Sequence, residues 1–219
     1  MHRDTTEYYA KDATSKVAIG HLSFALEHAG PVVHDAAAAS GDYVAALQQA
    51  GHTCTGSDIN GGYVAIAKGR GLPVEEWDAA ALGLPDDSVD TVLLFEVLEH
   101  VPDPDVRRRI LQESKRVARR NVLITTPHSG ELDLLFQCGL TYEHMLDRDH
   151  SVFFTEPMLR AELGQVFDTF TLTQEEEIDS RLVSRLFSPR TQKVLHLVSR
   201  VKPYQPKLFF RFYAVASAQ

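Results

Sequence analysis

The chain has 219 residues and a mass of 24.4 kDa; 44% of its residues are hydrophobic and 24% are charged. This composition is that of a globular protein with a full-sized core, and it excludes an intrinsically disordered chain. No apolar run approaches the ~18 residues that a membrane-spanning helix needs. The N-terminus is polar, and the cysteines Cys54 and Cys138 form no CxxC pair. We therefore expect a single-domain cytoplasmic protein without a secretory signal, disulfide framework or zinc cluster.

The net charge of −8 is spread unevenly along the chain. The last acidic residue is Asp179, and the eight basic residues that follow are accompanied by no acid. The acidic body disfavours a nucleic-acid partner, because phosphate contacts need an extended basic surface. The basic segment 181–211 is either a solvated face or a surface for peripheral contact with an anionic membrane.

Strands and helices are predicted to alternate along most of the chain. Helical patterns cover 7–29, 42–50, 60–69, 104–118 and 156–165, and a basic amphipathic helix is predicted over 180–201. Strand patterns cover 32–34, 52–58, 73–78, 89–95, 121–126, 167–173 and 208–217. The alternation predicts an α/β fold, with a doubly wound, mostly parallel seven-stranded sheet and helices on both faces.

The expected single domain has four parts. An N-terminal helix at 1–30 precedes a core at 31–127, whose crevice at the carboxyl ends of the strands would bind a cofactor. The irregular stretch 128–155 follows the fifth strand, and loops of this length in compact domains are commonly lids. Residues 156–219 would complete the sheet and include the basic helical insertion before the last strand.

The first predicted strand leads into Asp35, and a turn of small residues then connects it to a helix. Such a turn brings the backbone close to a ligand and directs helix N–H groups toward a negative group. Ala37, Ala39 and Gly41 belong to this turn. Glycine permits positive φ and close approach, whereas alanine restricts both.

A second acid, Asp58, ends the second predicted strand 23 residues after Asp35 and is followed by Ile59. A carboxylate at this position can accept hydrogen bonds from both ribose hydroxyls of a nucleoside. It can also cap the following helix, and the two roles are compatible. Acids at two successive strand ends favour a nucleoside cofactor.

The most specific pattern runs from Trp77 to Pro104 and reads WDAAALGLPDDSVDTVLLFEVLEHVPDP. With the turn VVHDAAAASG, it resembles the class I S-adenosylmethionine-dependent methyltransferases of the small-molecule type, over about residues 30–127. Ala37 and Ala39 stand where this family usually has glycines. A nicotinamide-dependent dehydrogenase is disfavoured because its G-x-G-x-x-G turn is missing, and a P-loop lysine is missing as well.

The resemblance implies the cofactor S-adenosylmethionine, which leaves as S-adenosylhomocysteine. It implies that Asp78 accepts a hydrogen bond from the adenine amino group beside Ala79, and that Phe95 and Glu96 flank the cofactor. The complete expected set is Asp35, Ala37, Ala39, Gly41, Asp58, Ile59, Asp78, Ala79, Phe95 and Glu96. The acceptor would be an oxygen or nitrogen of a small molecule or a lipid-linked saccharide.

Methyl transfer mainly requires alignment and exclusion of water, so a dedicated base is optional. His100, His144 and His150 are the candidates for acceptor binding or proton removal. The acids and histidines of 143–150 match no metal-ligand template, and we predict no metal site from them. The alternative function is a non-catalytic binding protein with the same fold, in which Ala37 and Ala39 crowd out the methionine part of the cofactor.

Overall fold

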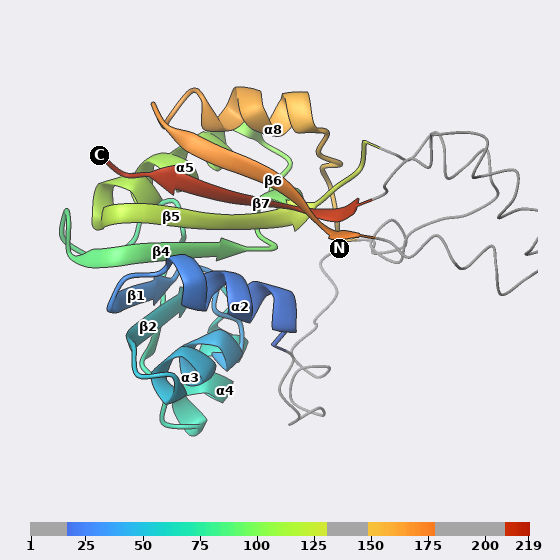
Figure 1. Cartoon of the computed structure of the whole chain (residues 1–219). Helices are drawn as coiled ribbons and strands as arrows, with labels where there is room; N and C mark the ends of the chain where they lie inside the picture. The colour runs from blue at the N-terminus through green and yellow to red at the C-terminus, as the bar shows by residue number, and fades with distance from the viewer. Residues whose placement is uncertain (1–16, 131–148, 178–208) are drawn as a thin grey trace, which may run out of the picture.

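The computed structural model describes residues 17–130, 149–177 and 209–219. The middle of the expected lid, with His144, lies outside these residues, as does the expected basic helix over 180–201. The described residues form the predicted α/β fold, a seven-stranded, mostly parallel sheet with helices on both faces (Figure 1). No helix among them is both long and apolar enough to cross a membrane.

Six of the seven strands run in the same direction, and β7 alone runs antiparallel to its two neighbours, β5 and β6. The strands are β1 (Val32–Asp35), β2 (Thr53–Asp58), β3 (Val74–Glu76), β4 (Val89–Phe95), β5 (Ala118–Pro127), β6 (Phe170–Glu177) and β7 (Phe209–Ser217). Their order is β3-β2-β1-β4-β5-β7-β6, so β7 lies between β5 and β6 (Figure 1). The strand order reverses between β1 and β4, which is where open α/β sheets bind ligands.

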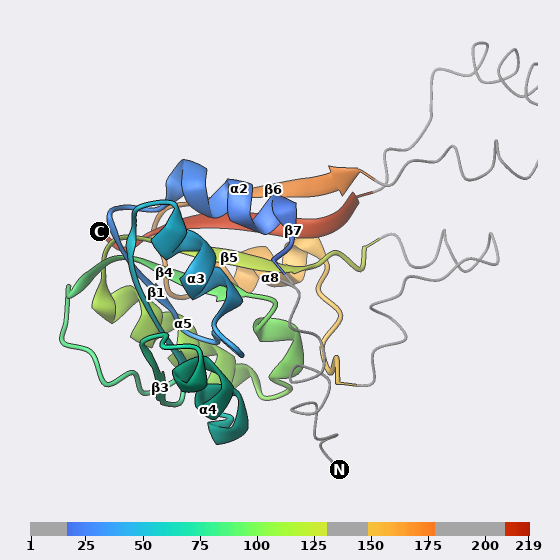
Figure 2. The same cartoon turned by 90° about the horizontal axis from the view of Figure 1, so that it is seen from below.

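Helices cover both faces of the sheet (Figure 2). One face carries α2 (Ile19–His28), α3 (Asp42–Gln49) and α4 (Gly61–Gly69), and the other carries α5 (Pro104–Val117) and α8 (Glu156–Leu163). The short 3-10 helix η1 (Leu98–His100) joins β4 to α5. Side chains of β4 alternate between the two layers: Val92 and Leu94 pack with α5 and α8, whereas Leu93 and Phe95 pack with α2, α3 and α4. This period of two is that of a strand buried on both faces.

Two helices that leave the carboxyl edge of the sheet begin with capping side chains. Asn60 Oδ1 accepts the Gly62 N–H at 2.9 Å at the start of α4. Asp103 Oδ1 accepts the Asp105 N–H at 2.9 Å, and Pro104 occupies the first position of α5. These caps satisfy N–H groups that would otherwise lack partners, and they fix the helix starts close to the strand ends.

The element boundaries differ most from the sequence prediction in three places. The first helix begins at Ile19 within the described residues, because the backbone of Ala18 is extended. β5 begins at Ala118, directly after α5. β6 spans Phe170–Glu177 rather than 167–173. Its run of glutamates is compatible with a strand because β6 lies at the edge of the sheet, where charged side chains are common.

Candidate functional site

The turn after β1 is hydrogen-bonded to the end of β2. Ala38 donates its N–H to the Ser57 carbonyl at 2.8 Å, and Ala39 donates its N–H to Asp58 Oδ2 at 2.9 Å. Ala39 has a φ of 44° and Gly41 a φ of 82°, both in the left-handed region. The turn therefore has two left-handed positions, and an alanine occupies one of them despite the steric cost of its Cβ.

A glycine in β2 allows the turn to approach this closely. A Cβ on Gly56 would lie 2.7 Å from the Cβ of Ala38 and 2.9 Å from Val44 Cγ2. Both distances are shorter than side chains tolerate without a shift. The close approach that the sequence pattern attributes to glycines in the turn is thus provided here by a glycine in the neighbouring strand.

Asp58 holds the junction between the turn and α4. Its Oδ2 accepts the Ala39 N–H, and its Oδ1 accepts the Asn60 N–H at 2.8 Å. Burial raises the pKa of this carboxyl, and the two backbone N–H groups oppose that shift. Each oxygen still has a lone pair, so the carboxylate can accept two further hydrogen bonds from a ligand. The adjacent Ile59 is 71% exposed, which leaves an apolar side chain open beside the acid.

Asp35, at the end of β1, is a buried acid with an unpaired oxygen. Its side chain is 2% exposed, and Oδ2 has no hydrogen-bond partner among the described residues. Burial raises its pKa to about 7; the backbone N–H of Ala37 opposes this shift, and the charge of Asp58 adds to it. Buried polar atoms are rarely left without a partner in folded proteins, so this oxygen marks a place for a donor from a ligand.

His34 lies beneath the turn and was not identified from the sequence. Its ring nitrogens pair with Thr55 Oγ1 at 2.8 Å and Ser57 Oγ at 3.0 Å, and its ring stacks near Trp77. Burial lowers its pKa to about 4, so the imidazole is neutral at neutral pH. A neutral histidine with both nitrogens paired supports the shape of the strand ends and has no free nitrogen for catalysis.

Asp78 and Ala79 follow β3 and so lie at the same edge of the sheet as Asp35 and Asp58. The Asp78 side chain is exposed, and its Oδ1 accepts the Ala80 N–H at 2.8 Å. Ala79 is half-buried against the core. The local turn thus fixes the Asp78 carboxylate while leaving its other oxygen exposed to solvent or a ligand.

Glu96 directly follows β4 with a φ of 54°, which is unusual for a residue with a side chain. Its Oε1 accepts from Thr125 Oγ1 at 3.0 Å, and its Oε2 accepts from Arg211 Nε at 3.1 Å. Arg211 also contacts Glu176, whose Oε1 accepts from Tyr213. The strained backbone at Glu96 is therefore held in place by groups from β5 and β7.

Phe95, the preceding residue, is mostly covered by protein. It is 7% exposed and packs against His21 of α2 and Tyr43 of α3, with ring centroids 5.3 and 5.4 Å apart. Burial lowers the pKa of His21, and the nearby charge of Glu96 opposes that shift. Phe95 thus contributes a wall that α2 and α3 support, whereas Glu96 supplies the polar group at this strand end.

Three residues beyond Glu96, η1 brings another acid and a histidine to the same edge. Glu99 is 1% exposed, and burial, followed by the charge of Glu96, raises its pKa well above the ordinary range. His100 is exposed, and its ring lies 4.8 Å from that of His150 between centroids. The structure therefore brings two of the three candidate histidines together, while the third, His144, lies outside the described residues.

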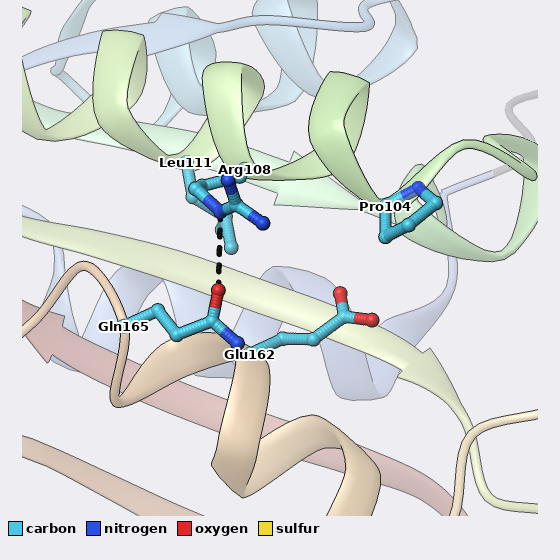
Figure 3. Close-up of a pocket in the computed structure, with 5 residues that line it drawn as sticks. All are labelled: Pro104, Arg108, Leu111, Glu162 and Gln165. Carbon is cyan, nitrogen blue, oxygen red and sulfur yellow. Dashed lines mark hydrogen bonds between the residues drawn. The ribbon is translucent and has the colours of Figure 1, made fainter.

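A separate small cavity of about 80 Å³ lies between α5 and α8 (Figure 3). It is lined by Pro104, Arg108, Leu111, Glu162 and Gln165, and Arg108 Nε donates to Gln165 Oε1 at 3.1 Å. None of these residues was predicted as a site residue. The cavity belongs to the packing of two helices on one face, and the acids described above belong to the carboxyl edge of the sheet.

The comparison with known families identifies one match. Residues 34–125, which span β1 to β5, match a family described as a methyltransferase domain. The matched region includes all ten residues predicted to bind the cofactor. No curated protein matches the chain.

Solved structures of similar fold cover most of the chain. An S-adenosylmethionine-dependent methyltransferase from Archaeoglobus fulgidus has a TM-score of 0.66 and 17% identity, covering 96% of this chain and 99% of its own. Magnesium protoporphyrin IX methyltransferase from Synechocystis, with S-adenosylhomocysteine bound, has a TM-score of 0.57 and 19% identity, covering 90% and 80%. A methyltransferase from Methanosarcina mazei has a TM-score of 0.55 and 20% identity, covering 84% and 91%. At these identities, the likeness establishes the fold.

Proposed function

We propose that the protein is a class I S-adenosylmethionine-dependent methyltransferase that transfers a methyl group from S-adenosylmethionine to an oxygen or nitrogen of a small-molecule or lipid-linked acceptor. The match of residues 34–125 to a methyltransferase domain supports this proposal. When bound, the cofactor supplies an electrophilic methyl carbon on a sulfonium. The protein has to align that carbon with the acceptor and exclude water.

The observation that carries the proposal is the arrangement around Asp58. Its carboxylate is oriented from two sides, by the N–H groups of Ala39 and Asn60, and keeps one lone pair on each oxygen. A vicinal diol such as that of a ribose presents two donors at the spacing of one carboxylate. The exposed Ile59 beside it offers an apolar surface for the base, and Asp78 offers a carboxylate for the exocyclic amino group.

Asp35 and the turn would bind the opposite, amino-acid end of the cofactor. The unpaired Oδ2 of Asp35 is a suitable acceptor for an ammonium group, directly or through a water. The positive charge of such a group would also offset the cost of ionising this buried acid. Glu96 lies at the next strand end, and its carboxylate is already committed to Thr125 and Arg211.

Titration of the purified protein with S-adenosylhomocysteine tests cofactor binding directly. We expect saturable binding of one equivalent, and the absence of any binding would contradict the proposal. Incubation of the protein and S-adenosylmethionine with cell extracts, followed by mass spectrometry, would then find acceptors by the mass of an added methyl group. The basic segment 181–211 supports a lipid-linked acceptor, and sedimentation with anionic vesicles would test that.

A non-catalytic binding protein is the second candidate, and one observation favours it. Ala39 places a methyl group at a left-handed position of the turn, where glycine would leave more room for the cofactor. The two candidates differ in their outcomes. The extract assay separates them, because a non-catalytic binding protein would methylate nothing in any extract, whether or not it binds S-adenosylhomocysteine.

A further inference from the structure

Glu99, His100 and His150 form a cluster that the proposed cofactor site does not use. Glu99 and His100 are adjacent in η1, while His150 lies 50 residues further along the chain than His100. Each of the three offers one ligand atom, and these atoms all lie within 4.8 Å of one another. The fold, rather than any local motif, creates this juxtaposition, which explains why the sequence pattern of 143–150 alone predicts no metal site.

The buried carboxylate of Glu99 lacks a partner on one oxygen. Its Oε2 accepts from Thr126 Oγ1 at 3.0 Å, while Oε1 is buried and has no hydrogen-bond partner among the described residues. Leaving a buried carboxylate oxygen unpaired is costly, and such atoms are rare in folded proteins. A cation that binds this oxygen would remove the cost.

Backbone hydrogen bonds orient the ring of His100 and hold the segment that carries His150 against η1. His100 Nδ1 pairs with the Asp149 carbonyl at 3.1 Å, and because a carbonyl can only accept, Nδ1 carries the proton and Nε2 the lone pair. The Glu99 carbonyl accepts the N–H groups of Ser151 at 2.8 Å and Val152 at 3.0 Å, which ties the segment after His150 to η1. Hydrogen bonds of this kind commonly fix the ligands of metal sites.

We propose that Glu99, His100 and His150 bind one divalent first-row transition metal ion, of which zinc is the best match to the ligands. Two imidazoles and one carboxylate form the ligand set of many zinc sites that keep a further position open. Ligand distances of about 2.0–2.2 Å require the three atoms to lie ~3.5 Å apart. His100 is exposed and His150 half-buried, so rotation of these rings can close the remaining gap.

The role of the ion rests on the proposed function, methyl transfer to an acceptor. The cluster follows β4, at the edge where the acceptor would approach. An ion there would bind the oxygen of a hydroxyl-bearing acceptor and lower the pKa of that hydroxyl. In the transfer, the oxygen lone pair forms the bond to the methyl carbon, the sulfur–carbon pair stays on sulfur, and the hydroxyl proton passes to water. The site thus favours an oxygen acceptor over an amine.

Metal content and affinity test the site without any activity assay. The full chain would be freed of metal with a chelator, dialysed against zinc chloride and measured by elemental analysis. Titration with Co²⁺ would report the ligand geometry through its visible absorption. We expect one ion per chain and a roughly ten-fold or greater loss of affinity in His150→Ala and Glu99→Gln.

Two controls make the result specific. His28→Ala removes a histidine of α2, away from the cluster, and should bind zinc like the parent protein. Glu99→Gln retains the shape of the buried side chain, so it separates loss of a ligand from loss of folding, which circular dichroism would check. Absence of a stoichiometric ion, or equal affinity in His150→Ala, Glu99→Gln and the parent, would overturn the inference.

Titration of the same proteins with S-adenosylhomocysteine separates this inference from the proposed function. Cofactor binding without zinc binding would overturn the metal site alone. Zinc binding without cofactor binding would support the metal site and contradict the proposed methyl transfer.

Discussion

The backbone N–H of Ala39 lies 2.9 Å from Oδ2 of Asp58, so the turn after β1 and the end of β2 are held together by the same carboxylate that is expected to bind the ligand. The left-handed conformation of Ala39 belongs to this turn. A substitution at either residue should therefore alter the conformation of the other.

Replacing Asp58 by alanine should weaken S-adenosylhomocysteine binding by about 2–4 kcal/mol, because two hydrogen bonds to a charged acceptor are lost. Calorimetry measures the change. Glu75→Ala is the matched control, since Glu75 lies in the adjacent strand β3 but is 53% exposed and pairs only with Lys68 among the described residues. Unchanged affinity in Asp58→Ala would remove Asp58 from the binding site.

Replacing Ala39 by glycine should leave the free energy of unfolding unchanged or raise it by up to about 1 kcal/mol. Relief of the left-handed strain offsets the greater entropy of glycine in the unfolded chain. Ala37→Gly is the control from the same turn, because Ala37 lacks a positive φ. The Ala37→Gly substitution should lower the free energy of unfolding by about 0.5–1 kcal/mol. Equal losses in the two variants, measured by urea denaturation, would contradict the strain at Ala39.

Gly56→Ala should destabilise the protein by about 1–3 kcal/mol, because the new Cβ has no room beside Ala38 and Val44. It should also weaken cofactor binding, since the turn has to move away from β2. Gly69→Ala is the control: its Cβ would meet nothing within 4 Å, and alanine is the better helix former. If neither substitution changed the free energy of unfolding or cofactor binding, the close approach at Gly56 would be unimportant for both.

The pH dependence of stability should report the buried His34. Its folded pKa of about 4 lies below the ordinary value of 6.5, so between these values the unfolded chain binds a proton that the folded chain does not. Stability is lost as the pH falls through this window, by roughly 2 kcal/mol at pH 5. Asp35, whose folded pKa is raised, acts in the opposite direction.

A comparison of the parent protein with His34→Asn isolates the histidine, because Asp35 is present in both. The difference in unfolding free energy between the two proteins should shift in favour of His34→Asn by roughly 2 kcal/mol from pH 7 to pH 5. A constant difference across this range would show that His34 can take up its proton in the folded state.

The features that depend on the order of elements along the chain were predicted well from the sequence. Strands that alternate with helices predict a parallel sheet, and parallel strands bring Asp35 and Asp58 to one edge because each ends its strand. The strand order and the parallel pairing of β1 with β2 confirm the predicted sheet. The shift of β6 toward Glu177 escaped prediction because only its place at the sheet edge makes a polar strand acceptable.

Other features of the site depend on partners that are distant in the chain. Arg211 reaches Glu96 across 115 positions, and His100 meets His150 across 50. His34 gave no signal, because a histidine within an apolar strand has no periodic or spacing pattern that reveals its two hydroxyl partners. The positive φ of Ala39 likewise follows from the hydrogen bonds of the turn, and an alanine run alone predicts no such conformation.

The position of β7 has a consequence for biosynthesis. Within the described sheet, β6 pairs with β7 alone, and the other edge of β7 pairs with β5. During translation, residues 170–177 would therefore leave the ribosome before the strand they need exists, and β5 would remain an open edge for that time. Such an edge can pair with other nascent chains. The half of the sheet that contains β5, β7 and β6 should thus depend on chaperones more than the half formed by β1, β2 and β3.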